Sequence, residues 1–276
     1  KKKRGKKRKR EKKKKKEKKK KEKKEKKRKK KKEKEKKKEE KKKKEEKKKK
    51  KKRERKKREE KKKGEKEKKE KKGKKGKKRE EKERIAKEGY VALAPDYFHR
   101  TGPGIELGYD DAGMAEGMKH LGQLEADSMI SDARDAIAFL RGTKGVKGES
   151  IGAMGFCIGG HMTYLTVCET DVKAAAAYYG GGIAAPAGPG GVESTVSRSS
   201  KIQGSLICYF GGKDAMIPQE QVSAIREALE QTGGSHEVVV YPDADHGFNC
   251  NQRESYHEAS AIDAWSRTLA LFSKTL

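Results

Sequence analysis

The first 84 residues of this 276-residue chain contain no apolar, aromatic, proline or cysteine side chain. Only Lys, Arg, Glu and Gly occur before Ile85. A segment without apolar residues buries nothing that could offset the entropy lost when a chain becomes ordered. We therefore expect residues 1–84 to be a Lys-rich low-complexity tail, either disordered or transiently helical, because Lys and Glu are good helix formers.

The charge of the chain is concentrated in this tail. Residues 1–83 carry 60 basic and 19 acidic side chains, whereas residues 84–276 carry 16 basic and 24 acidic ones. Lys, Arg, Glu and Gly are also the residues that purine-only codons encode, so one interpretation is a translated purine repeat. The other is a basic arm that binds nucleic acid. Because the tail has no aromatic side chain for base stacking, such binding would be non-specific and salt-dependent.

Several other signals are missing from the chain. No run of 18 apolar residues occurs, so we expect no membrane span, and no signal peptide is visible. The four cysteines, Cys157, Cys168, Cys208 and Cys250, lack CxxC spacing and the histidine pairing of a zinc site. Isolated cysteines are typical of a reducing compartment, which predicts a cytoplasmic protein.

Apolar stretches of strand length alternate with helical patterns from residue 85 onward. We expect strands at residues 90–95, 150–156, 174–179, 205–210 and 237–242. We expect helices at residues 125–141, 158–169, 219–231 and 255–274, and loops at residues 101–124 and 180–200. Alternation of this kind predicts an α/β fold, with a parallel sheet covered by helices on both faces. Residues 85–276 have the size of one domain.

The strongest motif is Gly-Phe-Cys-Ile-Gly-Gly at residues 155–160, between an apolar strand and a helix. It matches the nucleophile elbow G-x-nucleophile-x-G, with Cys157 as the nucleophile. We expect Gly155 and Gly159 to be required because the sharp turn leaves no room for side chains. The helix N-terminus favours a thiolate, and the N–H of Ile158 would face a developing oxyanion. The alternative is a core cysteine in a glycine-rich turn.

Two further residues follow predicted strands directly. Asp214 comes after the strand at 205–210, and His246 after the strand at 237–242. Active groups of parallel sheets gather beyond the carboxyl ends of strands, and the order nucleophile, Asp, His is that of the α/β-hydrolases. Asp243 and Asp245 compete with Asp214 for the acid role. Taken singly, Asp214 also suits a turn or helix cap, and His246 a solvated loop.

The segments YVALAPD, GFCIGG, GGKDAMIP, DADHGFN and AWSRTLALF together resemble the dienelactone hydrolase (carboxymethylenebutenolidase) family of the α/β-hydrolase superfamily. The resemblance covers residues 84–276 and implies Cys157 as nucleophile, His246 as base and Asp214 as its orienting partner. It also implies that Arg100 contacts a substrate carboxylate, although an ordinary surface arginine is an equal alternative. The implied reaction is hydrolysis of a small-molecule ester or lactone through an acyl-enzyme, without a metal or organic cofactor.

The chain departs from the family pattern at two places. Cys250 stands where lactonase members have a second arginine, and the Lys-rich tail stands where the family has N-terminal strands. We therefore expect an N-terminally truncated α/β-hydrolase. Two rival functions follow from these departures: a catalytically impaired fragment or pseudoenzyme, and a tail-driven nucleic-acid binder.

Overall fold

The computed structural model describes residues 83–108 and 111–276 of the chain. The predicted tail, apart from its last two residues, lies outside the described residues, as does any nucleic-acid binding by it. The prediction that residues 1–84 and 85–276 form separate parts therefore stays a prediction. Across the part that is described, no helix has both the length and the apolar character that crossing a bilayer requires.

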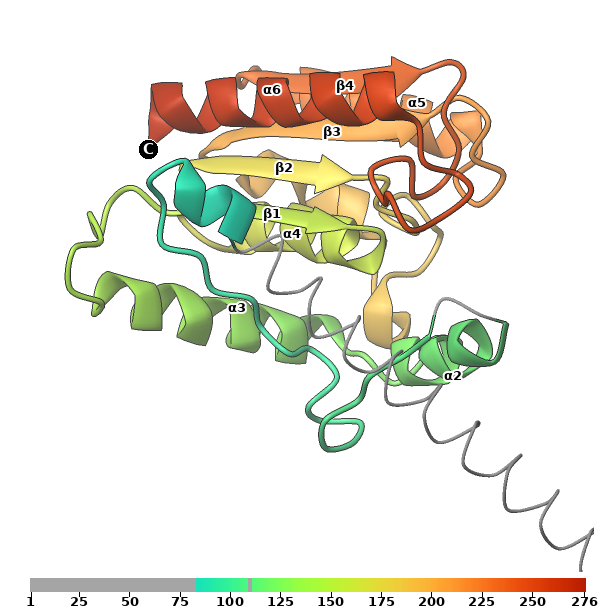
Figure 1. Ribbon diagram of the computed structural model, residues 1–276, viewed down its shortest axis with the longest axis horizontal. Coiled ribbons are helices and arrows are strands. Elements are labelled where there is room, and N and C mark those ends of the chain that lie inside the picture. The colour runs from blue at the N-terminus through green and yellow to red at the C-terminus, as the bar shows by residue number, and fades with distance from the viewer. Residues whose placement is uncertain (1–82, 109–110) are drawn as a thin grey trace, which may run out of the picture. The chain divides into compact units, whose positions relative to one another are not determined.

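The described elements succeed one another in strand–helix alternation (Figure 1). The strands are β1 (Gly152–Phe156), β2 (Ala174–Tyr178), β3 (Ser205–Gly211) and β4 (His236–Tyr241). The α-helices are α2 (Asp111–Leu121), α3 (Ala126–Arg141), α4 (Ile158–Glu169), α5 (Gln219–Gln231) and α6 (Glu258–Thr275). Two short 3₁₀ helices, η1 (Pro189–Gly191) and η2 (Thr195–Lys201), lie between β2 and β3.

The four strands form one parallel sheet in the order β1-β2-β3-β4, which confirms the predicted fold class. The pairing aligns Phe156 with Tyr178 and Tyr178 with Tyr209, so the strands reach the same edge together. In Figure 1 all four arrowheads point the same way. The turns that follow β1, β3 and β4 are therefore neighbours in space, although they are far apart in sequence.

Helices cover both faces of this sheet. Figure 1 shows α6 in front of the sheet and α4 behind it, with α3 packed outside α4. The central strand β2, which lies between β1 and β3, is almost entirely alanine, and every one of its residues is buried. A continuous apolar strand is what a sheet buried on both faces requires. On α3, the side chains that face α4 recur at helical spacing, as predicted, and include Met129, Ile130, Ala133 and Ile137.

The predicted strand at residues 90–95 is wrong. These residues belong to no strand or helix, and Val91 and Leu93 are exposed to 53% and 41%. A strand needs a neighbour that accepts and donates ladder hydrogen bonds, and β1 has β2 as its one partner within residues 83–108 and 111–276. An apolar run predicts burial in a sheet, but it does not supply the partner.

The two predicted loops are also partly helical. Helix α2 occupies residues 111–121 of the first, and η1 and η2 lie in the second. The glycine content of both segments pointed to irregular structure, because glycine disfavours helices. Packing overrides that preference in the second segment, where η2 is anchored by Thr195 and Ser199, both of them buried.

The alanines of β2 predict how the core responds to added volume. Ala176 is completely buried, so Ala176→Leu should lower the free energy of unfolding by about 1–3 kcal/mol through overpacking. Ala259→Leu is the matched control, because Ala259 is exposed on α6 and should change stability by less than about 0.5 kcal/mol. Urea titration followed by circular dichroism measures both. Equal stability of the two variants would contradict the described packing of β2.

Candidate active site

The backbone at Cys157 makes a sharp turn between β1 and α4. Cys157 has φ 56° and ψ −121°, one of two non-glycine residues with positive φ among the described residues. Its N–H donates to the carbonyl of Tyr178 at 3.0 Å, which continues the sheet pairing by one residue. Its own carbonyl accepts the N–H groups of Gly160 and His161, which begins α4. Strained backbone of this kind persists where the surroundings hold it, and it is frequent at functional sites.

Two glycines let the strand and the helix approach at this turn. A Cβ on Gly155 would overlap the carbonyl oxygen of Gly159, and a Cβ on Gly160 would lie 2.5 Å from the carbonyl oxygen of Tyr178. The expected role of Gly155 is thus confirmed. The expected role of Gly159 is wrong, because a Cβ there would meet nothing within 4 Å. The residue at which α4 approaches β2 most closely is Gly160, one position later.

The structure brings Cys157, His246 and Asp214 together at the carboxyl edge of the sheet. His246 Nδ1 lies 2.8 Å from Asp214 Oδ2, and His246 Nε2 lies 3.1 Å from Cys157 Sγ. His246 and Asp214 are buried, and Cys157 is partly exposed. With Asp214 ionised, Nδ1–H donates to the carboxylate, which leaves Nε2 to exchange a proton with sulfur. This continuous chain has the geometry of a nucleophile, a base and an orienting acid.

The surroundings decide which carboxylate meets His246. The second oxygen of Asp214, Oδ1, accepts the N–H of Met216 at 2.9 Å, so the carboxylate cannot rotate freely. Asp245 accepts the backbone N–H of His246 and not its ring, while Asp243 pairs with Lys213. Both competitors for the acid position are therefore engaged elsewhere.

The electrostatics of the pair favour separated charges. Burial lowers the pKa of His246, but hydrogen bonds and charge interactions with Asp214 and Cys157 raise it to about 9. Burial raises the pKa of the Cys157 thiol, but the hydrogen bond and positive charge of His246 act against it. The N–H of Ile158 and the charge of Arg253 add to this, and the pKa of Cys157 lies below its ordinary value. Both shifts favour an imidazolium–thiolate pair.

The buried cysteines of the core contrast with Cys157. Burial raises the pKa of Cys168 to about 12 and also raises the pKa of Cys208. Both belong to the apolar core, and in the part of the chain that the structure describes no hydrogen bond joins either thiol to a histidine, as one joins Cys157 to His246. Burial outweighs the lowering effect of Lys201 and Arg198 on the pKa of Cys168, so Cys157 is the cysteine suited to nucleophilic chemistry.

Tyr179 and Arg253 complete the surroundings of the triad and were missed by reasoning from the sequence. The Tyr179 ring packs edge-on against His246 with centroids 5.2 Å apart, and its backbone has φ 37°. It directly follows β2, which is the positional signal that could have identified it. Arg253 lies seven residues after His246, and no motif marks it.

Arg100 lies apart from the triad's hydrogen bonds. Its guanidinium pairs with Asp132 on α3, which also contacts His99. Within the described part of the chain, no hydrogen bond or ion pair joins Arg100 to Cys157, Asp214 or His246. The expected contact of Arg100 with a substrate stays a prediction.

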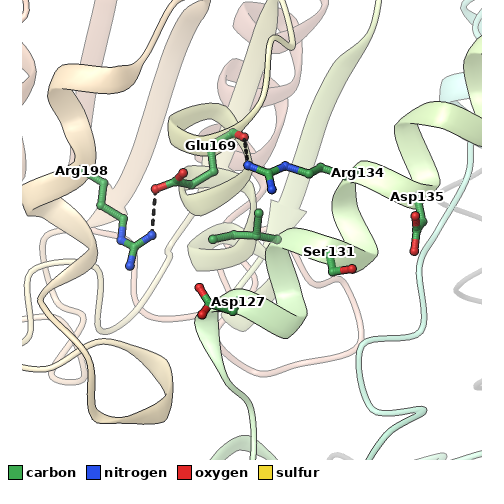
Figure 2. Close-up of a pocket in the computed structure, with 7 residues that line it drawn as sticks. Asp127, Ser131, Arg134, Asp135, Glu169 and Arg198 are labelled. Carbon is green, nitrogen blue, oxygen red and sulfur yellow. Dashed lines mark hydrogen bonds and ion pairs between the residues drawn. The ribbon is translucent and has the colours of Figure 1, made fainter.

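A pocket of about 380 Å³ lies away from the triad, between α3, the end of α4 and η2 (Figure 2). Its lining is polar, and Figure 2 shows Arg198 and Arg134 both directed at Glu169. Arg198 pairs with the Glu169 carboxylate at 2.7 Å, and Arg134 donates to the Glu169 carbonyl at 3.1 Å. Both arginines are thus engaged by Glu169, and no triad residue lines this pocket.

Comparison with known proteins agrees with this geometry. The model of the dienelactone hydrolase family matches residues 68–276, which begins inside the Lys-rich segment. A Synechocystis sp. protein provisionally named carboxymethylenebutenolidase is 42% identical over 194 residues, which cover 70% of this chain and 78% of that protein. The carboxymethylenebutenolidase of Rhodococcus opacus is 28% identical over 194 residues, or 70% of this chain and 73% of that protein.

The same likeness appears among solved structures. A crystal structure from Klebsiella pneumoniae subsp. pneumoniae, provisionally described as a dienelactone hydrolase, superposes with a TM-score of 0.60 at 34% identity. The superposition covers 69% of this chain and 78% of that structure. The elbow at Cys157, the parallel sheet and the family match agree. The chain belongs to the dienelactone hydrolase family.

Proposed function

We propose that this protein hydrolyses an ester or lactone bond of a small carboxylic substrate, with Cys157, His246 and Asp214 as its catalytic triad. The observation that carries the proposal is the unbroken chain from Asp214 Oδ2 through His246 to Cys157 Sγ. Membership of the dienelactone hydrolase family supports the same chemistry. The proposed steps use side chains and backbone groups of the chain and one water molecule.

The first half of the reaction forms a thioester. The Cys157 thiolate attacks the substrate carbonyl carbon, and a C–S bond forms while the carbonyl oxygen takes up negative charge. The N–H of Ile158, which already faces the sulfur, is the proposed donor to this oxyanion. Collapse of the intermediate breaks the C–O bond of the ester. His246 Nε2–H gives its proton to the departing oxygen, and Asp214 holds the ring in place.

The second half returns the enzyme to its starting state. Neutral His246 accepts a proton from water through Nε2, and the resulting hydroxide attacks the thioester carbonyl. The C–S bond then breaks and releases the carboxylic acid. Cys157 leaves as a thiolate and His246 is again an imidazolium, so charge and protons balance over the cycle. The directions of the two pKa shifts support a resting thiolate–imidazolium pair.

Arg100 is the proposed contact for a carboxylate on the substrate. It lies in the turn that follows residues 90–95, and its side chain is exposed. The guanidinium is already paired with Asp132, which holds it in one orientation. A planar guanidinium can bind a second carboxylate with its remaining donors, so the ion pair does not prevent this role.

Removing either reactive triad member tests the mechanism. Cys157→Ala and His246→Ala should each lower kcat/KM for p-nitrophenyl acetate by on the order of 10³-fold or more, because triad members act as a unit. Cys168→Ala is the control, since it removes a thiol from the far end of α4 and should leave kcat/KM unchanged. Retained hydrolysis in either triad variant would rule out this mechanism. If the unaltered protein hydrolyses no ester, the result would instead favour the alternative that it is a pseudoenzyme.

The thiolate itself can be tested without a substrate. Iodoacetamide at pH 7 should alkylate Cys157 faster than Cys250, and on the order of 10²-fold or more faster than Cys168 and Cys208, because the thiolate is the reacting form. Peptide mass spectrometry over time measures the four rates. The rate at Cys157 should fall as the pH drops through its lowered pKa. In His246→Ala the rate at Cys157 should fall toward that of Cys250, and an unchanged rate would argue against the ion pair.

Arg100→Gln distinguishes substrate binding from a structural role. If Arg100 binds a carboxylate, the variant should raise KM for the mono-p-nitrophenyl ester of succinic acid by roughly 10-fold or more, and should leave the neutral acetate ester unaffected. Asp132→Asn removes the ion pair but keeps Arg100, and serves as the companion variant. Equal losses for both esters, accompanied by a lower unfolding temperature, would assign Arg100 to structure alone.

A further inference from the structure

Arg253 lies in the segment that connects His246 to α6. Its N–H donates to the carbonyl of Cys250 at 2.9 Å, and its carbonyl accepts the N–H of Tyr256 at 3.1 Å. Two successive turns therefore fold residues 250–256 back on themselves. The side chain of Arg253 is directed by this fold and is half-buried.

The side chain of Arg253 packs against the backbone at Gly247, the residue that follows His246. Gly247 has φ +82°, and a Cβ there would lie 3.2 Å from Cδ and 3.4 Å from Nη1 of Arg253. The hydroxyl of Ser255 would lie 3.3 Å from the same point. The guanidinium thus occupies the space that a side chain at residue 247 would fill. Because Gly247 directly follows His246, which contacts Cys157 through Nε2, the guanidinium lies beside the backbone that carries the histidine.

The charge of Arg253 differs in kind from that of His246. Both act on the Cys157 sulfur and lower the pKa of its thiol. Among the described residues, the groups that also face this pair include the N–H of Ile158, the Tyr179 ring and, through His246, the carboxylate of Asp214. His246 becomes neutral whenever it gives up its proton. A guanidinium stays charged at every pH at which the protein is folded.

We propose that Arg253 is a further functional residue of this site, which stabilises negative charge at Cys157 from its place across Gly247. The inference deepens the proposed function, on which its role in turnover rests. Negative charge lies on the sulfur in the resting thiolate and again when the C–S bond breaks, and Arg253 acts as a fixed cation at both stages. It would also oppose loss of the thiolate at pH values where His246 is neutral.

Alkylation of Cys157 measures this effect without turnover. Arg253→Gln should raise the apparent pKa of the Cys157 thiol by about 0.5–1, and slow alkylation by iodoacetamide at pH 6–7 by roughly 3- to 10-fold, since the rate follows the thiolate fraction. Arg253→Lys keeps the charge and should recover most of the rate. Arg226→Gln removes the same charge from an exposed position on α5 and should leave the pH profile unchanged.

Charged and neutral reagents separate the possible roles. If Arg253→Gln slows iodoacetate but leaves the iodoacetamide profile unchanged, Arg253 attracts anions and does not stabilise the thiolate, and the proposal is overturned. Unchanged profiles with both reagents also overturn it. If Arg253→Gln fails to fold, as judged by circular dichroism, Arg253→Met preserves the apolar stem and answers the same question. A shifted profile in a chain that hydrolyses no ester would support this inference and reject the proposed function.

Discussion

The left-handed turn at Cys157 is the constraint on which the site depends. It places the sulfur beyond the end of β1, with the first turn of α4 directly behind it. The turn is possible because Gly155 and Gly160 lack side chains where strand, helix and the neighbouring strand approach most closely. The pairing of β1 with β2 extends to the N–H of Cys157 and holds the strained backbone in place.

The parallel register of the sheet then brings the other two members to the sulfur. Asp214 and His246 follow β3 and β4, whose ends are aligned by regular pairing. Burial raises the cost of an isolated charge, so each charged group here needs a partner. When the thiol is ionised, negative Asp214, positive His246 and negative Cys157 follow one another. Arg253, which lies beside Gly247, adds a second positive charge. Each charged group of the triad therefore has an opposite charge beside it.

Reasoning from the sequence succeeded where local pattern and chain order carry the information. The helices at α3, α4 and α5, the four strands and the fold class were predicted, and the predicted candidates Cys157, Asp214 and His246 lie within contact distance. It failed at residues 90–95, where an apolar run finds no partner strand, and at α2, where glycine content suggested a loop. It also assigned the close approach to Gly159, because the motif gives the spacing of glycines but not their contacts.

The sequence by itself determined the order of the elements and the candidate residues, because hydrophobic periodicity and the spacing of the elbow motif are local properties. Only the tertiary structure decided which carboxylate faces His246, since Asp214, Asp243 and Asp245 all lie near strand ends. The same holds for Arg253, whose effect on Cys157 arises from a contact across Gly247 that no spacing reveals. Charge interactions depend on distance in space, and residues separated by about 90 positions in the chain meet only when the sheet is formed.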